Sequence, residues 1–265
     1  MTLHAKAITV RLGGKTVLHS VDFTAHSGAL TAIVGPNGSG KTTLLRALTG
    51  DVAHDGDVTM NGQPVAQLAP WQLAELRAVL PQAATLAFPF STREVVRLGL
   101  IGRRALRPGA AGLVDAALSA VGLAGFGGRY FAELSGGEAQ RVQLARVLLQ
   151  VWEPVEAGIP RWLILDEPVA SLDIGHQLVI MRLAADFARA GGGVIAVMHD
   201  LNLTAMFADQ VALVHGGKVL AAGPVAEVFT DARLSLAYGC GLRTNTAPAG
   251  GGVFVLPQAA VPAAV

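Results

Sequence analysis

A short apolar stretch that runs directly into a glycine-rich loop constrains the fold of this chain more than any other feature. Residues 30–34 read Leu-Thr-Ala-Ile-Val, and residues 35–42 follow as Gly-Pro-Asn-Gly-Ser-Gly-Lys-Thr. The pattern predicts a buried strand, a loop whose backbone N–H groups surround a phosphate, and a helix over 42–49. It therefore indicates an α/β fold with a phosphate-binding loop.

The residue types in this loop indicate how a nucleoside triphosphate is held. Glycine lets the backbone N–H groups turn toward an anion. Lys41 is expected to contact the β- and γ-phosphates, and the hydroxyl of Thr42 is expected to ligate Mg²⁺. The predicted phosphate-binding residues are Gly35, Pro36, Asn37, Gly38, Ser39, Gly40, Lys41 and Thr42.

A second apolar stretch ends in two acidic residues. Residues 162–165 read Trp-Leu-Ile-Leu, and Asp166, Glu167 and Pro168 follow. Ligands of open α/β sheets bind at the carboxyl ends of the strands, so Asp166 is placed to orient magnesium through its water shell. Glu167 is then the expected general base for the attacking water. The alternative is an acidic pair at a strand exit, which the phosphate loop makes the weaker interpretation.

A third motif predicts a second anion-binding helix end. Ser135 precedes a helical pattern over 139–149, and Glu138 stands three residues later, as in a capping box. Gly136 and Gly137 leave the backbone N–H groups beside the cap unobstructed. Two such sites in one chain suggest a head-to-tail dimer, in which each ATP lies between the phosphate loop of one copy and Ser135 of the other. A helix cap alone is the simpler alternative.

Taken together, these motifs resemble the ATP-binding cassette (ABC) ATPases over essentially the whole chain. The motifs occur in that family's order: GPNGSGKTT, which adds Thr43 to the loop, then LSGGEAQR, LILDEP, Ser171-Leu172-Asp173 and a late His199. The resemblance implies a RecA-like P-loop core with an N-terminal antiparallel β subdomain and an inserted α-helical subdomain. It also implies ATP and Mg²⁺ as the bound species.

The same resemblance assigns roles that the residues alone do not. Gln82 would read the magnesium site and link it to the helical subdomain, and His199 would contact the γ-phosphate. Asp173 would belong to a loop that communicates across the dimer. The catalytic set is then Glu167, His199 and Gln82, and the metal set is Thr42, Gln82 and Asp166. The signature residues Ser135, Gly136, Gly137 and Glu138, with Asp173, complete the nucleotide site.

The chain is expected to form one domain over residues 1–265. Residues 1–82 and 155–240 make the nucleotide-binding core with its β subdomain, 83–154 the helical subdomain, and 241–265 an extension. Within this scheme the sequence predicts a hairpin of 2–10 and 16–25, strands at 58–60, 194–197 and 211–214, a helix over 71–80 and a last strand at 253–256.

One residue departs from the family pattern. The family places an aromatic residue near the end of the first strand to stack on adenine, and our alignment puts Val10 at that place. The sequence leaves open what contacts the adenine instead.

Further features resemble the importers of iron chelates, cobalamin and haem. Residues 88–96 and the long stretch 150–162 are similar to the ATP-binding subunits of bacterial haem importers. The resemblance implies two transmembrane permease subunits, a periplasmic binding protein reached through them, and a peripheral place on the cytoplasmic face of the bacterial inner membrane. Segment 83–96 is expected to dock on the permease. For His176, a structural or dimer-contact role is favoured over haem ligation.

Composition argues against other classes. The chain has a formal net charge of +1 and its basic residues are dispersed, which disfavours nucleic acid as the partner. The single cysteine, Cys240, excludes an internal disulfide. Ferric siderophore or cobalamin import remains the alternative to haem import. A soluble ABC ATPase and a small-molecule kinase are weaker, since the stretch between Gln82 and Ser135 is short and a kinase leaves LSGGE unexplained.

Overall fold

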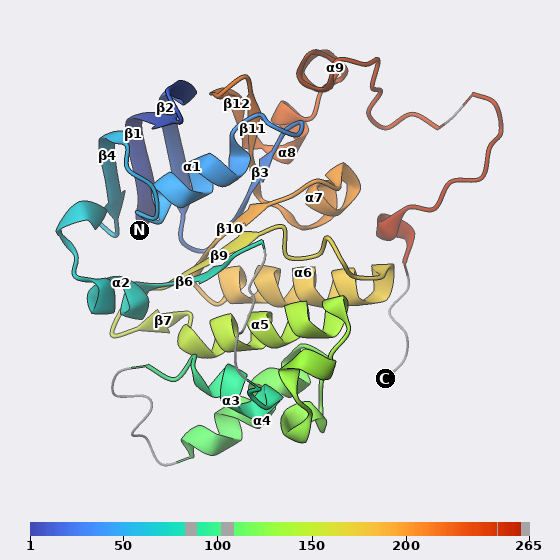
Figure 1. Ribbon diagram of the computed structural model, residues 1–265. Helices are drawn as coiled ribbons and strands as arrows, with labels where there is room; N and C mark the ends of the chain where they lie inside the picture. Colours follow the sequence, from blue (N-terminus) through green and yellow to red (C-terminus); the bar gives the residue numbers. More distant parts are fainter. Residues whose placement is uncertain (83–88, 102–108, 248, 261–265) are drawn as a thin grey trace.

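The computed structural model describes residues 1–82, 89–101, 109–247 and 249–260. A parallel sheet lies in the middle, an antiparallel sheet with one helix lies on one side, and most of the helices lie on the other (Figure 1). The helices are α1 (Lys41–Leu48), α2 (Pro70–Leu76), α3 (Thr92–Arg97), α4 (Ala110–Ala120), α5 (Gly136–Gln150), α6 (Ile174–Arg189), α7 (Leu201–Phe207), α8 (Val225–Val228) and α9 (Asp231–Tyr238).

The central sheet has the strand order β12-β11-β3-β10-β9-β6. Five of these strands run parallel, and β12 pairs with β11 in the antiparallel direction. Every residue of β3, β9 and β10 is buried, as expected for strands with both faces covered. The strands are β3 (Leu30–Val34), β6 (Arg77–Leu80), β9 (Trp162–Asp166), β10 (Gly193–Val197), β11 (Gln210–His215) and β12 (Lys218–Pro224).

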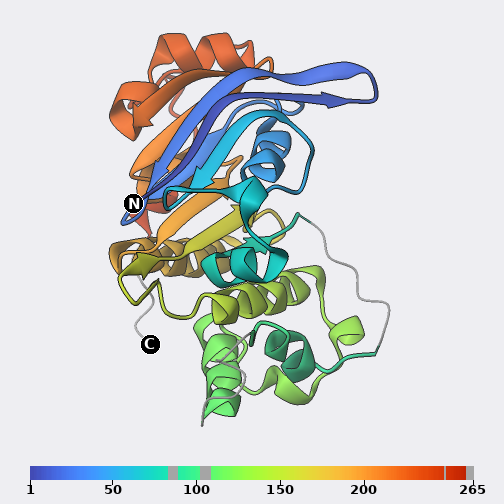
Figure 2. The ribbon, with the colours of Figure 1, turned by 90° about the vertical axis from the view of Figure 1, so that its left-hand side faces the viewer.

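The predicted N-terminal hairpin forms the larger part of a second, antiparallel sheet. Its strands are β1 (Thr2–Leu12), β2 (Lys15–His26), β4 (Asp55–Met60) and β5 (Gln63–Pro64), in the order β2-β1-β4-β5. Figure 2 shows the long β1–β2 hairpin extending over α1.

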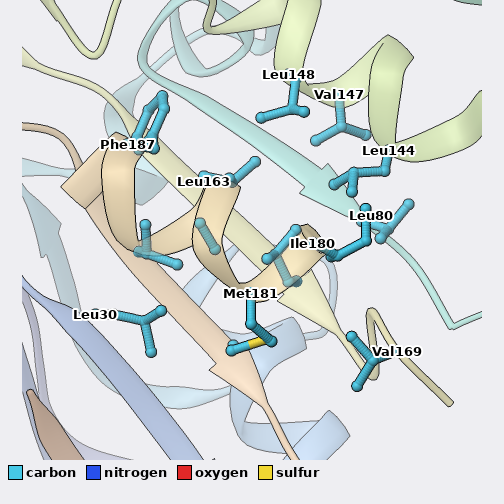
Figure 3. Close-up of a cluster of buried hydrophobic side chains, with 14 of the residues drawn as sticks. Leu30, Leu80, Leu144, Val147, Leu148, Leu163, Val169, Ile180, Met181 and Phe187 are labelled. Carbon is cyan, nitrogen blue, oxygen red and sulfur yellow. The ribbon is translucent and has the colours of Figure 1, made fainter. Parts of the chain in front are cut away.

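Two hydrophobic cores lie on opposite faces of the central sheet. The first joins Leu44 and Leu48 of α1 to Ile33 and Ile195 of the sheet and to the antiparallel strands. The second lies on the opposite face, where Leu163 of β9 and side chains of α5 and α6 form one cluster (Figure 3). The central sheet is thus fixed from both sides, which makes its carboxyl edge a rigid base for a site.

The helical insertion packs on the second face. Helices α3 and α4 both contact α5, and α5 in turn contacts β6. Figure 3 shows Leu144 of α5 beside Leu80 of β6. The helix predicted over 139–149 is confirmed as part of α5, which also covers this face of the sheet.

The predicted helix over 71–80 is wrong in its second half. Helix α2 ends at Leu76, and Arg77 to Leu80 form β6, which pairs with β9. Ala78 and Leu80 are buried while Arg77 and Val79 are half-buried, which is the period-two pattern of a strand. Gln150 of α5 donates to the carbonyls of Ala74 and Arg77, so the end of α2 is satisfied by a distant side chain.

The strand expected at 253–256 is also wrong. Those residues are irregular, and Val253 is 98% exposed. An apolar run makes a strand only where it finds a neighbouring strand, and this one lies beside a short 3-10 turn, η5 (Pro257–Ala259), that contacts α7. The long stretch before β9 holds a small hairpin instead of a plain loop, β7 (Val155–Glu156) with β8 (Ile159–Pro160).

Candidate functional site: a nucleotide cleft at the carboxyl edge of the central sheet

The glycine-rich loop joins β3 to α1, as predicted. A Cβ atom on Gly35 would lie 2.1 Å from the carbonyl oxygen of Val214, and one on Gly40 would lie 2.8 Å from the Leu18 side chain. Both residues also have positive φ angles, so glycine is required on two grounds. Gly40 caps α1 without any side-chain hydrogen bond, which leaves the first N–H groups of the helix free for an anion.

Lys41 is held over the loop by the loop's own carbonyl groups. Its ammonium donates to the carbonyl oxygens of Gly35 and Pro36, at 2.9 and 3.0 Å. Burial lowers the pKa of Lys41 below its usual range, and the charges of Glu167 and Asp166 offset part of that effect. A phosphate placed in the loop would give this buried cation an anionic partner.

Two of the three expected metal residues, Thr42 and Asp166, lie next to each other, whereas the Gln82 amide is bonded to Glu167. The Thr42 hydroxyl donates to Asp166 Oδ1 at 3.3 Å. Burial, with Glu167 close by, raises the pKa of the Asp166 carboxyl. Among the described residues no group of three or more His, Cys, Asp or Glu side chains could hold a metal alone. A hydroxyl and one carboxylate fit Mg²⁺, which commonly takes few protein ligands and completes its shell with water and substrate phosphates.

Glu167 is fixed through both carboxylate oxygens. His199 Nε2 lies 2.6 Å from Oε1, and the Gln82 amide donates to Oε2 at 3.0 Å. These three residues follow β9, β10 and β6, which are neighbours in the sheet. The structure therefore brings the three predicted catalytic residues together at the carboxyl edge of parallel strands.

These groups line one cleft of about 640 Å³. Its walls are Leu12, Val17, Asn37, Gly38, Gly40, Lys41, Thr42, Thr43, Gln82, Glu167 and His199. The floor is polar and lies on the phosphate loop, whereas Leu12 and Val17 come from the ends of β1 and β2. The cleft thus offers phosphate-binding groups at the loop and an apolar wall on the hairpin.

The assignment of Val10 to the adenine wall is wrong. Val10 is 0% exposed and belongs to the core beneath the antiparallel sheet. The pairing of β1 with β2 shifts register between Val10 and Arg11, and Leu12, at the strand end, is 41% exposed and lines the cleft. The signal available in the sequence was that Leu12 directly precedes the Gly13-Gly14 turn, where the strand leaves the core.

The signature residues lie outside this cleft. Ser135 caps α5: its hydroxyl accepts from the Glu138 backbone at 3.3 Å, and Glu138 accepts from the Ser135 backbone at 2.8 Å. The expected capping box is therefore present. The hydrogen bonds that the backbone and side chain of Ser135 make to the Glu138 carboxylate lower the pKa of Glu138. Ser135 and Gly136 are exposed, so this helix end faces solvent in the single chain.

Asp173 also lies outside the cleft and caps α6. It accepts from the His176 backbone at 2.9 Å and from His176 Nδ1 at 2.8 Å, and these contacts lower its pKa. His176 therefore has a local structural contact, in line with the interpretation favoured from the sequence.

The fold and the cleft define a phosphate-loop ATPase that carries a second, signature helix end. A model of the ABC transporter family matches residues 18–170. A hemin import ATP-binding protein of Roseobacter denitrificans is 59% identical, with 98% of this chain and 99% of that protein covered. Proteins with the same description from Jannaschia sp. and Rhizobium etli are 60% and 55% identical, over 97% and 98% of this chain and 95% and 98% of theirs. The chain belongs to the ABC transporter ATP-binding family.

Solved structures share the fold at lower identity. A nucleotide-free ATP-binding cassette from an ABC transporter superposes with a TM-score of 0.75 at 23% identity, covering 90% of this chain and 99% of that one. A dimeric cassette in a post-hydrolysis state with ADP and phosphate gives 0.72 at 24%, covering 85% and 99%. Among the described residues no helix has the length and apolar character needed to cross a membrane.

Proposed function

We propose that this chain is the ATP-hydrolysing subunit of a bacterial haem importer. The observation that carries the ATPase assignment is Glu167, held between Gln82 and His199 at the mouth of a phosphate loop. The haem assignment is supported by the 55–60% identity to hemin import ATP-binding proteins over nearly the whole chain. The alternative substrates are ferric siderophores and cobalamin.

In the proposed reaction the chain's own residues position the triphosphate and activate water. The loop N–H groups and Lys41 would bind the β- and γ-phosphates, and Thr42 and Asp166 would hold Mg²⁺, which would neutralise charge on the transferred phosphoryl group. The Glu167 carboxylate accepts the proton of the attacking water. Gln82 and His199 fix the two oxygens of that carboxylate, which holds the base in one orientation.

The second half of each site is proposed to come from another copy of the chain. Ser135 and Gly136 are exposed and lie outside the cleft of their own chain, and the start of their helix offers N–H groups suited to a γ-phosphate. A head-to-tail dimer would place Ser135, Gly136, Gly137 and Glu138 of one copy over the phosphate loop of the other. Asp173, in the loop after Glu167, would then lie at the dimer contact.

The remaining partners follow from an importer role. Two permease subunits, a periplasmic binding protein reached through them, and a peripheral position on the cytoplasmic face of the inner membrane complete the proposed assembly. Segment 83–96 is the proposed permease contact, although Leu86 and Phe88 lie outside the described residues. Of the described part, Phe90 packs against the helical core and Ser91 caps α3.

Co-purification and reconstitution test this function. The full chain, expressed with the permease genes that accompany it, is purified in detergent and placed in proteoliposomes with the binding protein. We expect ATPase activity that haem-loaded binding protein stimulates, and haem uptake that requires ATP. Stimulation by a ferric siderophore or cobalamin instead would reassign the substrate. Failure to associate with any membrane protein would favour a soluble ABC ATPase.

A further inference from the structure

Gln140, on the second turn of α5, reaches the backbone of the proposed general base. Its side-chain Nε2 donates to the carbonyl oxygen of Glu167 at 3.0 Å. A carbonyl oxygen only accepts hydrogen bonds, so the amide nitrogen of Gln140 must face it. The Oε1 atom of Gln140 is buried and has no hydrogen-bond partner among the described residues. The contact with Glu167 is therefore the polar contact that orients this amide.

The backbone that Gln140 holds is strained. Glu167 has a φ angle of +54°, a left-handed conformation that residues other than glycine rarely adopt. Such a conformation persists only where the surroundings fix it, and it often occurs at functional sites. The Glu167 N–H donates to the carbonyl oxygen of Val197 on β10 at 3.2 Å. The Glu167 carbonyl accepts from the Gln140 side chain at 3.0 Å and from the Ala170 N–H at 3.4 Å. The backbone N–H of Glu167 is thus held by the sheet, and its carbonyl is held by the signature helix together with the turn that follows Glu167.

The start of α5 lies against the same segment of chain. A Cβ atom on Gly137 would stand 3.1 Å from the carbonyl oxygen of Ser171 and 3.2 Å from the Leu172 side chain. Ser135, which caps this helix, precedes Gln140 by five residues, or about 7.5 Å of helix rise. A displacement of the Ser135 end therefore reaches both Glu167 and the loop that follows it.

We propose that Gln140 is a positioning residue that couples the two ATP sites of the dimer. This proposal rests on the proposed function, in which Ser135 binds the nucleotide of the partner subunit. When that nucleotide draws the end of α5 inward, Gln140 carries the movement to the Glu167 carbonyl. The carboxylate is then brought to the water in its own site. Each subunit would in this way bring its own Glu167 carboxylate to the attacking water only when its Ser135 also binds the partner's ATP.

Replacing Gln140 with Met tests the coupling, because Met has a similar length and cannot donate a hydrogen bond. We expect kcat for ATP hydrolysis by the full chain to fall about tenfold, the usual scale for loss of one such bond. The affinity for ATP and ATP-driven dimerisation should be retained, because Gln140 touches neither the phosphate loop nor Ser135. The Hill coefficient for ATP should move toward one.

Gln143 supplies a matched control on the same helix. It is buried and bonded to Arg146 rather than to Glu167. Gln143→Met should lower thermal stability at least as much as Gln140→Met does, and it should leave kcat unchanged. If both variants lower kcat equally, or if Gln140→Met leaves kcat and the Hill coefficient unchanged, Gln140 has only a structural role.

Two further variants separate this proposal from the proposed function. In a Glu167→Gln background, Gln140→Met should cost nothing more in single-turnover hydrolysis, because both changes act through the same base. Additive losses would overturn the positioning role. Ser135→Arg tests the shared site itself: if it leaves dimerisation and ATPase intact, the dimer model fails, whereas normal activity in Gln140→Met alone rejects only the coupling.

Discussion

At the scale of single residues, Glu167 is the group whose chemistry is most sharply defined. Its two oxygens contact His199 and Gln82, so side chains of the chain itself orient the carboxylate. Glu167→Gln keeps the shape of the side chain and removes its ability to accept a proton from water. We expect steady-state hydrolysis to fall by about 10²–10⁴-fold, the usual contribution of a general base.

The variant should still bind ATP and accumulate as ATP-bound dimers. ATPase assays at saturating MgATP and size-exclusion chromatography with ATP measure the two properties. Glu75→Gln, an exposed carboxylate on α2, serves as the control and should behave as the wild type. Near-normal turnover by Glu167→Gln would remove Glu167 from the role of base.

The buried charge of Asp166 is expected to lower the stability of the folded chain. Burial raises the pKa of this carboxyl above its ordinary value, so its ionised form is less stable in the folded chain than in the unfolded chain. We expect Asp166→Asn to raise the melting temperature of the nucleotide-free chain at neutral pH while abolishing Mg²⁺-dependent hydrolysis. The stability gain should shrink as the pH falls through the folded pKa of Asp166 and vanish below its unfolded pKa. Calorimetry of both proteins across that range measures the trend, and a gain independent of pH contradicts the charge-burial account.

The apolar wall formed by Leu12 and Val17, where adenine is expected to lie, leads to a prediction about nucleotide binding. Leu12 lines the cleft where an aromatic ring could stack on the base. Stacking of a base on an aromatic side chain is worth about 1–3 kcal/mol in single-strand nucleic-acid binders, and we take the lower end for an exposed wall. Leu12→Tyr should therefore lower the half-saturating ATP concentration by roughly tenfold or less. The maximal rate should hardly change, because such a contact is equal in the ground and transition states.

Val10→Tyr is the informative control for that experiment. Its ring would enter a filled core, where overpacking typically costs about 1–3 kcal/mol of stability. It should lower the melting temperature and leave nucleotide affinity unimproved. If Leu12→Tyr leaves half-saturation unmoved, another side chain already covers the adenine. The wild type should also discriminate loosely between ATP and GTP.

At the scale of elements, the segment that follows Gln82 is expected to transmit movement to the permease. Its sequence contains the apolar residues Leu86, Phe88 and Phe90, four to eight positions after Gln82, which contacts Glu167. Apolar side chains that are exposed together often mark protein interfaces. Phe88→Asp should lower transport in proteoliposomes severalfold and leave ATP binding by the isolated subunit intact. Assembly and uptake at wild-type levels would place the permease contact elsewhere.

The elements that carry the site could be read from local sequence. Strands β3, β9 and β10 are continuous apolar runs, and the residues that follow them belong to short motifs of fixed spacing. Ser135 and Glu138 also form the capping box that their spacing indicates. Local patterns were sufficient here because each motif's function requires a particular backbone geometry.

Other elements depended on contacts that local sequence does not contain. The four residues of β6 follow α2 without a break, and their pairing with β9 decides their conformation. Val10 was misplaced because a register shift in β1 separates the core-facing residues from Leu12 at the strand end. The contact of Gln140 with Glu167 joins residues 27 positions apart, and only the fold reveals it.

At the scale of the whole molecule, the proposed dimer requires each chain to supply two halves of different nucleotide sites. The cleft contains the phosphate loop and the base, and Ser135 lies outside it on a free helix end. Two copies related head to tail would complete both sites at once. Closing on ATP would then move the two helical insertions, and with them any permease bound beside Gln82.

This arrangement predicts that defects in the two halves differ in kind. Lys41 acts inside its own chain, so Lys41→Ala should weaken nucleotide binding or turnover in the monomer. Ser135 acts across the interface, so Ser135→Arg should leave ATP binding to the monomer intact and block dimer closure with a bulky charge.

Mixing the two variants is decisive, because a mixed dimer contains one site with both defects and one site with neither. Equimolar mixtures should therefore regain part of the ATPase activity that each variant lacks alone, measured as turnover against the mixing ratio. No recovery at any ratio, with mixed dimers present by cross-linking, would mean either that the halves are not shared or that one intact site cannot turn over. Normal dimerisation of Ser135→Arg alone would decide for the first.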